Sequence, residues 1–451
     1  MSPGSDMIAA LATPSGESAI ALIRVSGPGA RAIAAEILGR DPVPRFATRA
    51  ELRDMKGAIL DDTIITFFEG PNSYTGEDVV EISGHGNPMI ARRILENLCS
   101  RGCRVAEPGE FTRRAFMNGR MDLSQAEAVM DLIRARGDRA IEAANRQLRG
   151  ALGRQVSSLS DTLLGAIARV EAYIDFPEED LPTDDRDLLC KLIESVLKPM
   201  SALLATGRYG ELLRAGVRTV IVGEPNAGKS SLLNRLLGWE RAIVSATPGT
   251  TRDFLEEPRI IGGHCIRLTD TAGLSRTPGE IEGLGIARTL DLVAGADLIL
   301  LVVDSSLPFP ALGVELFAAV SPLNTVVVWN KSDLSPPRVT PPPFRDSRSV
   351  SVCALDGSGF GHLESAISDF VELHRKDPGP ELIAINARHA LDLADSRECL
   401  ERALSKVEIG QSDEMLAADL RCALDCLGRI GGRIDNEQML DKLFAEFCIG
   451  K

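Results

Sequence analysis

The sequence is poor in aromatic residues, with 2 Trp and 3 Tyr among its 451 residues. A protein that binds single-stranded nucleic acid mainly by stacking needs more rings than this. The net charge of −14 also excludes a surface coated in basic residues, so any contact with nucleic acid has to be local. An apolar content of 44% is ordinary for a globular protein, and the length predicts roughly three domains.

Long apolar runs are absent too: no stretch approaches about 18 uninterrupted apolar residues, and the N-terminus lacks a charged segment followed by an apolar one. We expect a soluble, cytoplasmic protein without a membrane segment. The nine cysteines include no C-x-x-C pair, which argues against a disulfide framework or a zinc ribbon. Cys99/Cys103 and Cys422/Cys426 are each spaced by one helical turn. That spacing suits a metal, although structural thiols are the commoner explanation.

Two kinds of segment flank the middle of the chain. Residues 1 to about 118 predict a mixed α/β domain, with strands at 19–25, 59–68 and 79–82 and helices at 30–38, 88–99 and from Glu110. Ser124 and Glu127 form a capping-box pattern that predicts a long helix to about Tyr173. The acidic residues between Glu171 and Asp187 predict a solvated loop, with a metal site as the alternative. Helical pattern resumes at 188–214 and again after about Pro380.

Residues 217 to about 374 alternate strands with helices, with strands expected at 217–222, 265–269, 298–303, 325–329 and 349–353. This alternation predicts a doubly wound, parallel α/β domain. The Pro-rich stretch 336–344 is expected to be a surface loop.

The stretch Gly223-Glu224-Pro225-Asn226-Ala227-Gly228-Lys229-Ser230-Ser231 fits the phosphate-loop pattern G-x-x-x-x-G-K-[ST] between a strand and a helix. Its backbone N–H groups can surround a phosphate, Lys229 adds a positive charge, and the Ser230 hydroxyl can ligate Mg²⁺. A glycine-rich turn that binds nothing is the alternative for this loop taken alone.

Further motifs follow in the order that a GTPase needs. Gly249 to Asp253 offers hydroxyls, Asp270-Thr271-Ala272-Gly273 follows a strand, and Asn330-Lys331-Ser332-Asp333 can select guanine through its Asp. Cys353-Ala354-Leu355 stands where a Ser-Ala pair commonly closes over the base. We therefore expect GTP to contact Asn226, Ala227, Gly228, Lys229, Ser230, Ser231, Ser245, Ala246, Thr247, Pro248, Gly249, Thr250, Thr251, Asp270, Thr271, Ala272, Gly273, Asn330, Lys331, Asp333, Cys353, Ala354 and Leu355.

The position after Gly273 is Leu274, where small signalling GTPases place a water-orienting Gln. Leucine cannot orient water, so another group has to do so. Glu280 and Glu282 follow closely, and either is a candidate or an ordinary acid at a helix N-terminus.

Motifs outside this core resemble one family along nearly the whole chain: the tRNA wobble-uridine modification GTPases called MnmE or TrmE. They are Ile23-Arg24-Val25-Ser26-Gly27, Glu81-Ile82-Ser83-Gly84-His85-Gly86, Pro108 to Phe116 with Asn118 to Leu123, and the terminal Phe447-Cys448-Ile449-Gly450-Lys451. The resemblance implies an α/β plus α fold in which a Ras-like doubly wound G domain is inserted in a helical domain. The implied domains are an N-terminal folate-binding and dimerisation domain (1–118), a helical domain in two parts (119–214 and 376–451), and a G domain (215–375).

The resemblance also implies roles for single residues. Asn226, Ser245, Thr247 and Thr250 match K⁺ ligands, Ser230 and Thr251 match Mg²⁺ ligands, and Glu282 matches the catalytic glutamate. Arg24, Glu81, Arg120 and Lys451 match contacts to a formyl- or methylene-tetrahydrofolate, with Arg120 standing where many members have Lys. Cys448 matches a cysteine of the modification chemistry; a thiol packed beside Phe444 and Phe447 is the alternative.

Family members form homodimers and a heterotetramer with MnmG (GidA), the partner that carries FAD. Together they add an aminomethyl or carboxymethylaminomethyl group to C5 of the wobble uridine of tRNA. The alternative from the G-domain motifs alone is a ribosome-assembly GTPase switch. The arginines between Arg92 and Arg154 form the one long basic-leaning region and are a hypothetical tRNA surface.

Overall fold

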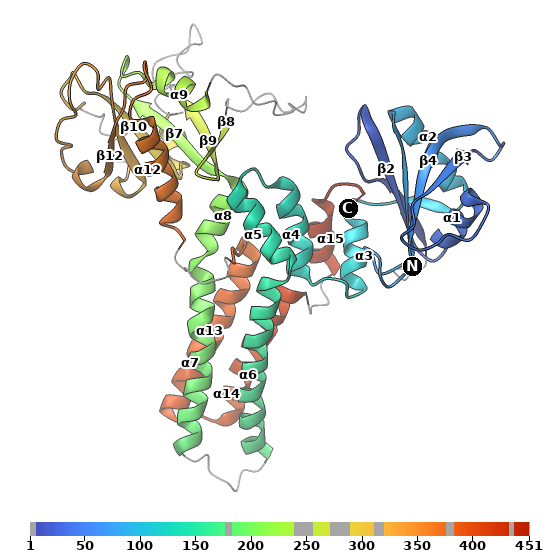
Figure 1. Ribbon diagram of the computed structural model, residues 1–451. Helices are drawn as coiled ribbons and strands as arrows, with labels where there is room; N and C mark the ends of the chain where they lie inside the picture. Colours follow the sequence, from blue (N-terminus) through green and yellow to red (C-terminus); the bar gives the residue numbers. More distant parts are fainter. Residues whose placement is uncertain are drawn as a thin grey trace. The chain divides into compact units, whose positions relative to one another are not determined.

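The computed structural model describes residues 6–175, 183–238, 256–270, 289–310, 320–375, 383–432 and 437–450 (Figure 1). The chain packs as two compact units. The first contains residues 1–130, 148–158 and 427–451, and the second contains residues 131–147 and 159–426. Over the described ranges, every helix is too short or too polar to cross a membrane.

The first unit holds a six-stranded sheet in the order β3-β4-β5-β2-β1-β6. Neighbouring strands are antiparallel except for the parallel pair β1 and β6. The strands are β1 (Met7–Leu11), β2 (Ser18–Ser26), β3 (Thr48–Arg53), β4 (Ile59–Phe68), β5 (Val79–Gly86) and β6 (Cys103–Val105).

Helices α1 (Ala30–Leu38) and α2 (Pro88–Ser100) cover one face of this sheet, where Ile33 and Ile94 pack against Ile23 and Ile82. Alternate residues of β1 face the other side, where Ile8 packs with Phe111 of helix α3 (Glu110–Met117). The mixed α/β architecture predicted for this part is therefore confirmed.

Cys99 and Cys103 are spaced by one helical turn in the sequence, but they do not lie on one helix. Helix α2 ends at Ser100, and Gly102 at φ 96° turns the chain into β6, which begins at Cys103. A spacing of four residues places side chains on one face only while the helix continues.

The predicted capping box is displaced by two residues. Helix α4 (Leu123–Arg134) already includes Ser124, and its first turn is capped by Asp122. The Asp122 carboxylate accepts from the Gln125 backbone N–H at 2.8 Å, and the Gln125 side chain accepts from the Asp122 backbone N–H at 2.9 Å. These reciprocal bonds are those of a capping box, formed here by Asp and Gln.

The long helix predicted from Ser124 to Tyr173 is three helices: α4, α5 (Asp138–Leu148) and α6 (Ala151–Asp175). The breaks fall at Gly137 and Gly150. Gly150 adopts φ 80°, and a side chain on Gly137 would lie 2.5 Å from the carbonyl of Gly263. The next predicted helix likewise divides into α7 (Thr183–Ala205) and α8 (Gly207–Ala215). The C-terminal helices are α13 (Ala387–Ile409), α14 (Asp413–Gly431) and α15 (Glu437–Ala445).

The second unit contains a six-stranded sheet in the order β12-β11-β10-β7-β9-β8. Its strands are β7 (Val217–Gly223), β8 (Glu257–Ile261), β9 (His264–Asp270), β10 (Leu298–Asp304), β11 (Thr325–Asn330) and β12 (Arg348–Ser351). The prediction of an all-parallel sheet missed β8, which runs antiparallel to β9 at the edge.

Strand β10 is buried along its whole length and shows how this sheet is covered. Leu300 and Val302 pack on the side of helices α9 (Lys229–Leu237) and α12 (Phe360–Glu372). Leu301 and Val303 pack on the opposite side, together with Phe344 from the Pro-rich loop. Burial of both faces is what a doubly wound domain requires, so the predicted fold class is confirmed.

We predict that Asp122→Ala lowers the free energy of unfolding by about 1 kcal/mol, because the first turn of α4 loses its cap. Asp122→Asn is the matched control and should retain most of the stability, since Asn is an equally good N-cap. Urea unfolding followed by circular dichroism measures both. A larger loss for Ser124→Ala than for Asp122→Ala would restore Ser124 as the cap.

Candidate functional site

The phosphate loop leaves β7 at the carboxyl edge of the second sheet and leads into α9. Gly228 precedes the helix at φ 95°, and Asn226 adopts φ 64°, a conformation that Asn tolerates better than most residues. The Lys229 ammonium lies 2.8 Å from the carbonyl oxygens of Gly223 and Glu224. The lysine therefore lies along the loop, at a helix N-terminus whose N–H groups favour an anion.

Asn330 connects this loop to the next motif. Its side-chain amide is buried, donates to the carbonyl of Ala227 at 2.9 Å, and accepts from the backbone N–H of Ala354 at 3.1 Å. A side chain on Gly228 would lie 2.1 Å from the same amide nitrogen. One amide thus positions both the phosphate loop and the 353–355 loop, and it explains why Gly228 has no room for a side chain.

Asp304 is a residue that the sequence reasoning missed. It ends β10, and its carboxylate lies 2.6 Å from the Lys331 ammonium. Burial alone would raise the pKa of Asp304, but hydrogen bonds from Lys331 and Ser306 outweigh it and hold that pKa below its ordinary value. Lys331 adopts φ 60°, so this ion pair helps to hold an unusual backbone conformation. The sequence signal that could have identified Asp304 is a carboxylate at the end of a buried strand.

The loop predicted to close over the base is anchored from α9. Arg235 donates to the carbonyl oxygens of Leu355, at 3.3 Å, and Asp356, at 2.5 Å. Cys353 is buried, whereas Leu355 and the predicted guanine-reading Asp333 are exposed. The side chain of Asp333 is therefore accessible to a ligand. The 353–355 loop is held in place through its backbone carbonyl groups.

In the first unit, Arg24 and Glu81 face each other on β2 and β5. The Glu81 carboxylate accepts from Nε and Nη2 of Arg24 at 3.0 and 2.8 Å. The guanidinium also lies 5.1 Å from the ring centre of Tyr74 and 5.7 Å from that of Phe111. The two predicted residues are thus in contact, and the two rings are additional members that sequence reasoning missed.

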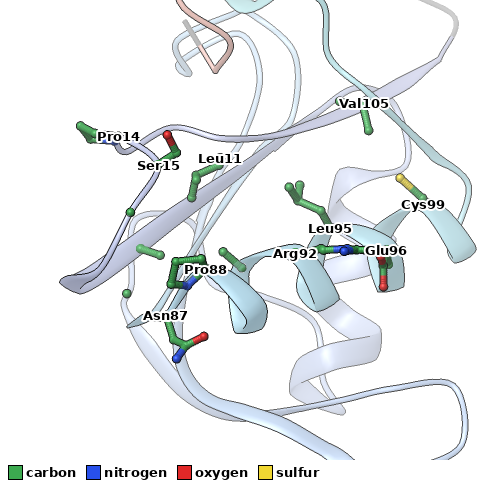
Figure 2. Close-up of a pocket in the computed structure, with 14 residues that line it drawn as sticks. Leu11, Pro14, Ser15, Asn87, Pro88, Arg92, Leu95, Glu96, Cys99 and Val105 are labelled. Atoms are coloured by element: carbon green, nitrogen blue, oxygen red, sulfur yellow. Dashed lines mark hydrogen bonds and ion pairs between the residues drawn. The ribbon is translucent and has the colours of Figure 1, made fainter. Parts of the chain in front are cut away.

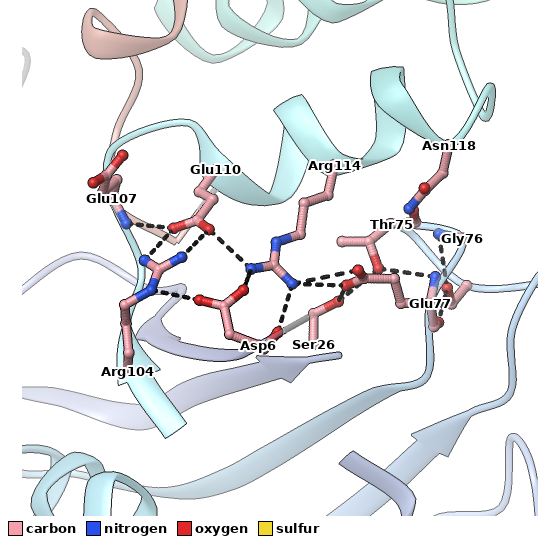
Figure 3. A network of polar contacts seen from close by, with 11 residues as sticks. Asp6, Ser26, Thr75, Gly76, Glu77, Arg104, Glu107, Glu110, Arg114 and Asn118 are labelled. Carbon is pink, nitrogen blue, oxygen red and sulfur yellow. Dashed lines mark hydrogen bonds and ion pairs between the residues drawn. The ribbon is translucent and has the colours of Figure 1, made fainter. Parts of the chain in front are cut away.

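The loop that carries Tyr74 is held by an ionic network around one buried arginine (Figure 3). Arg114, with 7% of its side chain exposed, donates to the carboxylates of Asp6, Glu77 and Glu110. A side chain on Gly76 of this loop would lie 3.2 Å from Cγ of Arg120, which is exposed. Arg120 therefore lies beside the loop, while no described contact joins it to Arg24.

The C-terminal segment lies against the residues that precede helix α3. Pro108 and Ile449 form an antiparallel bridge, and the Gly109 N–H donates to the carbonyl of Cys448. Phe447 is buried, but Cys448 is exposed. The exposure of Cys448 argues against the alternative of a thiol packed beside Phe444 and Phe447.

A cavity of about 500 Å³ lies in another part of the first unit (Figure 2). Its lining is mostly apolar and includes Leu11, Pro88 and Leu95. Arg24, Glu81, Arg120 and Cys448 do not line it. The predicted residues thus lie outside this cavity.

Several predicted site residues lie outside the described residues, so their placement stays a prediction. They are Ser245, Ala246, Thr247, Pro248, Gly249, Thr250, Thr251, Thr271, Ala272, Gly273, Glu282 and Lys451. The competing Glu280 lies outside as well. Asp270 is described as the last residue of β9.

Many arginines of the basic-leaning region are engaged with carboxylates. Arg101 pairs with Glu36, Arg113 with Asp441, and Arg146 with Glu142. Arg104 and Arg114 pair within the network of Figure 3. Such pairing lowers the net positive charge that this region offers to phosphates.

Comparisons with known proteins cover the whole chain. A family model described as the MnmE helical domain matches residues 123–448, and one described as the N-terminus of the GTP-binding protein TrmE matches residues 7–120. The tRNA modification GTPase MnmE of Opitutus terrae is 54% identical over 100% of both chains. Those of Akkermansia muciniphila and Aquifex aeolicus are 44% and 42% identical over 98% of this chain and 98% and 99% of their own. The chain therefore belongs to the MnmE family of tRNA modification GTPases.

Proposed function

We propose that this chain is a K⁺-dependent GTP hydrolase that modifies C5 of the wobble uridine in certain tRNAs. The group added is aminomethyl or carboxymethylaminomethyl, and a formyl- or methylene-tetrahydrofolate supplies the carbon. The reaction takes place in the cytoplasm, in a homodimer that joins the FAD-dependent MnmG (GidA) in a heterotetramer. The observation that carries the GTPase part is the Asn330 amide, which holds the phosphate loop and the 353–355 loop together.

GTP binding is supported by the order of the motifs and by their positions at one edge of the sheet, after β7, β9 and β11. In this proposal Lys229 binds the β- and γ-phosphates, and Ser230 and Thr251 hold Mg²⁺, with Asp270 acting through water. Asp333 accepts from the guanine N1–H and amino group. The bound Mg²⁺ supplies positive charge to the phosphates, and this chain's contribution is to fix the phosphates beside it.

A K⁺ site in the phosphate loop is supported by the conformation of Asn226. Asn226 has a φ of 64° and is exposed, so it is accessible to a cation. Amide and hydroxyl oxygens are hard donors that suit such a cation. We propose Ser245, Thr247 and Thr250 as the other ligands, and Glu282 as the residue that orients the attacking water in place of the Gln that Leu274 replaces.

A folate site on the first sheet is supported by the Arg24–Glu81 pair between Tyr74 and Phe111. A guanidinium held beside aromatic rings offers donors for a carboxylate or carbonyl and an apolar surface for a ring system. Arg120 and Lys451 would add positive charge toward the glutamate part of the cofactor. The exposed Cys448 is the proposed cysteine of the modification chemistry.

GTP hydrolysis should be at least about tenfold faster in K⁺ than in Na⁺ at equal ionic strength, because only the ion of the right size completes the charge beside the phosphates. Asn226→Gly removes the ligand while Gly keeps the positive φ, so this variant should lose the K⁺ preference but still bind GTP. Phosphate release measured in the two salts tests this. Equal rates for the wild-type protein would remove the K⁺ assignment.

Arg24→Ala should weaken binding of formyl-tetrahydrofolate by ~10- to 100-fold, the value of one or two hydrogen bonds to a charged group. Equilibrium dialysis on the full-length protein gives the affinity. Arg49→Ala is the matched control, since Arg49 is exposed and paired with Asp62 in the same sheet. Equal affinities for both variants would place the folate site away from Arg24.

A further inference from the structure

Three cysteines of the helical part of the second unit converge on one point. Cys399 lies on α13, and Cys422 and Cys426 lie one turn apart on α14. Their three sulfur atoms lie within 4.8 Å of one another, and those of Cys399 and Cys422 are 2.8 Å apart. Nothing in the GTPase or the folate chemistry uses this cluster.

Two of the three cysteines are buried, and the third is exposed. Cys399 and Cys426 are 4% and 3% exposed, whereas Cys422 is exposed. A small ligand can therefore reach the sulfur atoms past Cys422. The two buried thiols provide this ligand with sulfur atoms in fixed positions.

Three sulfur atoms converge at this point, and two of them belong to buried residues. A disulfide would use only two of the three. A thiophilic cation binds all three, and its own charge replaces that of the departing protons.

A positive charge, that of Arg402, lies next to the cluster. Nη2 of this arginine lies 3.2 Å from Sγ of Cys399. Three thiolates and one divalent cation carry a net charge of −1, and this guanidinium, which also pairs with Glu398 and Asp419, lies beside them. Among the described residues, no histidine or carboxylate joins the three sulfurs as a further ligand.

We propose that Cys399, Cys422 and Cys426 form a binding site for a divalent d¹⁰ cation of the zinc and cadmium class. Binding releases three protons and forms three metal–sulfur bonds, with no change of oxidation state. Water completes the coordination on the open side, beside Cys422. Soft thiolates select such ions over Mg²⁺ and Ca²⁺, which prefer oxygen.

The geometry needs one adjustment. Two sulfurs on a tetrahedral zinc lie about 3.8 Å apart, because each Zn–S bond is about 2.3 Å. Cys399 and Cys422 therefore have to separate by about 1 Å. Rotation of the exposed Cys422 side chain provides this movement without disturbing the buried pair.

Cadmium titration of the full-length protein tests the site. The protein is reduced with a phosphine, stripped of metal and kept anaerobic. Cd²⁺ is then added against a competing chelator, and the cadmium–thiolate absorbance and the bound Cd²⁺ per chain are measured. The variant is Cys422→Ser, which removes an exposed ligand and leaves the core intact. The control is Cys190→Ser on α7, which removes a thiol outside the cluster.

Wild type and Cys190→Ser should each bind one more Cd²⁺ per chain than Cys422→Ser, and excess Zn²⁺ should displace this ion. Equal Cd²⁺ binding by wild type and Cys422→Ser would overturn the proposal. It would also be overturned if the reduced wild type showed no additional Cd²⁺ while peroxide joined Cys399 and Cys422 in a disulfide. That second outcome would make the two cysteines a redox pair.

Discussion

The nucleotide site depends on one buried amide. Asn330 donates to Ala227 in the phosphate loop and accepts from Ala354 in the base loop, so its side chain fixes the distance between two segments far apart in sequence. A buried amide that loses either partner is costly, at about 1–3 kcal/mol. This constraint accounts for Gly228, whose lack of a side chain leaves room for the amide. The next residue, Lys331, is held by Asp304 at the end of the neighbouring strand.

In the first unit, a charged side chain has the positioning role that the Asn330 amide has in the second unit. Arg114 is buried among three carboxylates and holds the segment that carries Tyr74, which in turn lies over Arg24. The C-terminal residues complete this unit: Ile449 pairs with Pro108, and a side chain on Gly450 would lie 2.4 Å from the carbonyl of Leu11. The contact leaves the Cys448 thiol exposed on the domain that carries the proposed folate residues.

Much of this fold could be predicted from local sequence patterns, because the elements concerned are determined by residues close together in the sequence. The strand before the phosphate loop, the helix after it and the doubly wound arrangement follow from apolar periodicity and from a motif that requires that setting. Periodicity could not divide the long helical segment, because its breaks depend on Gly137 fitting against the distant Gly263 carbonyl. The capping box was misplaced because Ser and Asp both cap helices. The contact of Tyr74 with Arg24 and that of Cys399 with Cys422 join separate elements, and spacing along the chain does not record such contacts.

We propose that an intact Asn330-anchored GTP site is needed to modify the wobble uridine. The most direct measurement is mass spectrometry of wobble uridine in tRNA from cells that lack this protein and are complemented with wild type or Asn330→Ala. We expect unmodified uridine without the protein, restored modification with wild type, and no restoration with Asn330→Ala expressed at the same level. Full restoration by Asn330→Ala, or normal modification without the protein, would contradict it.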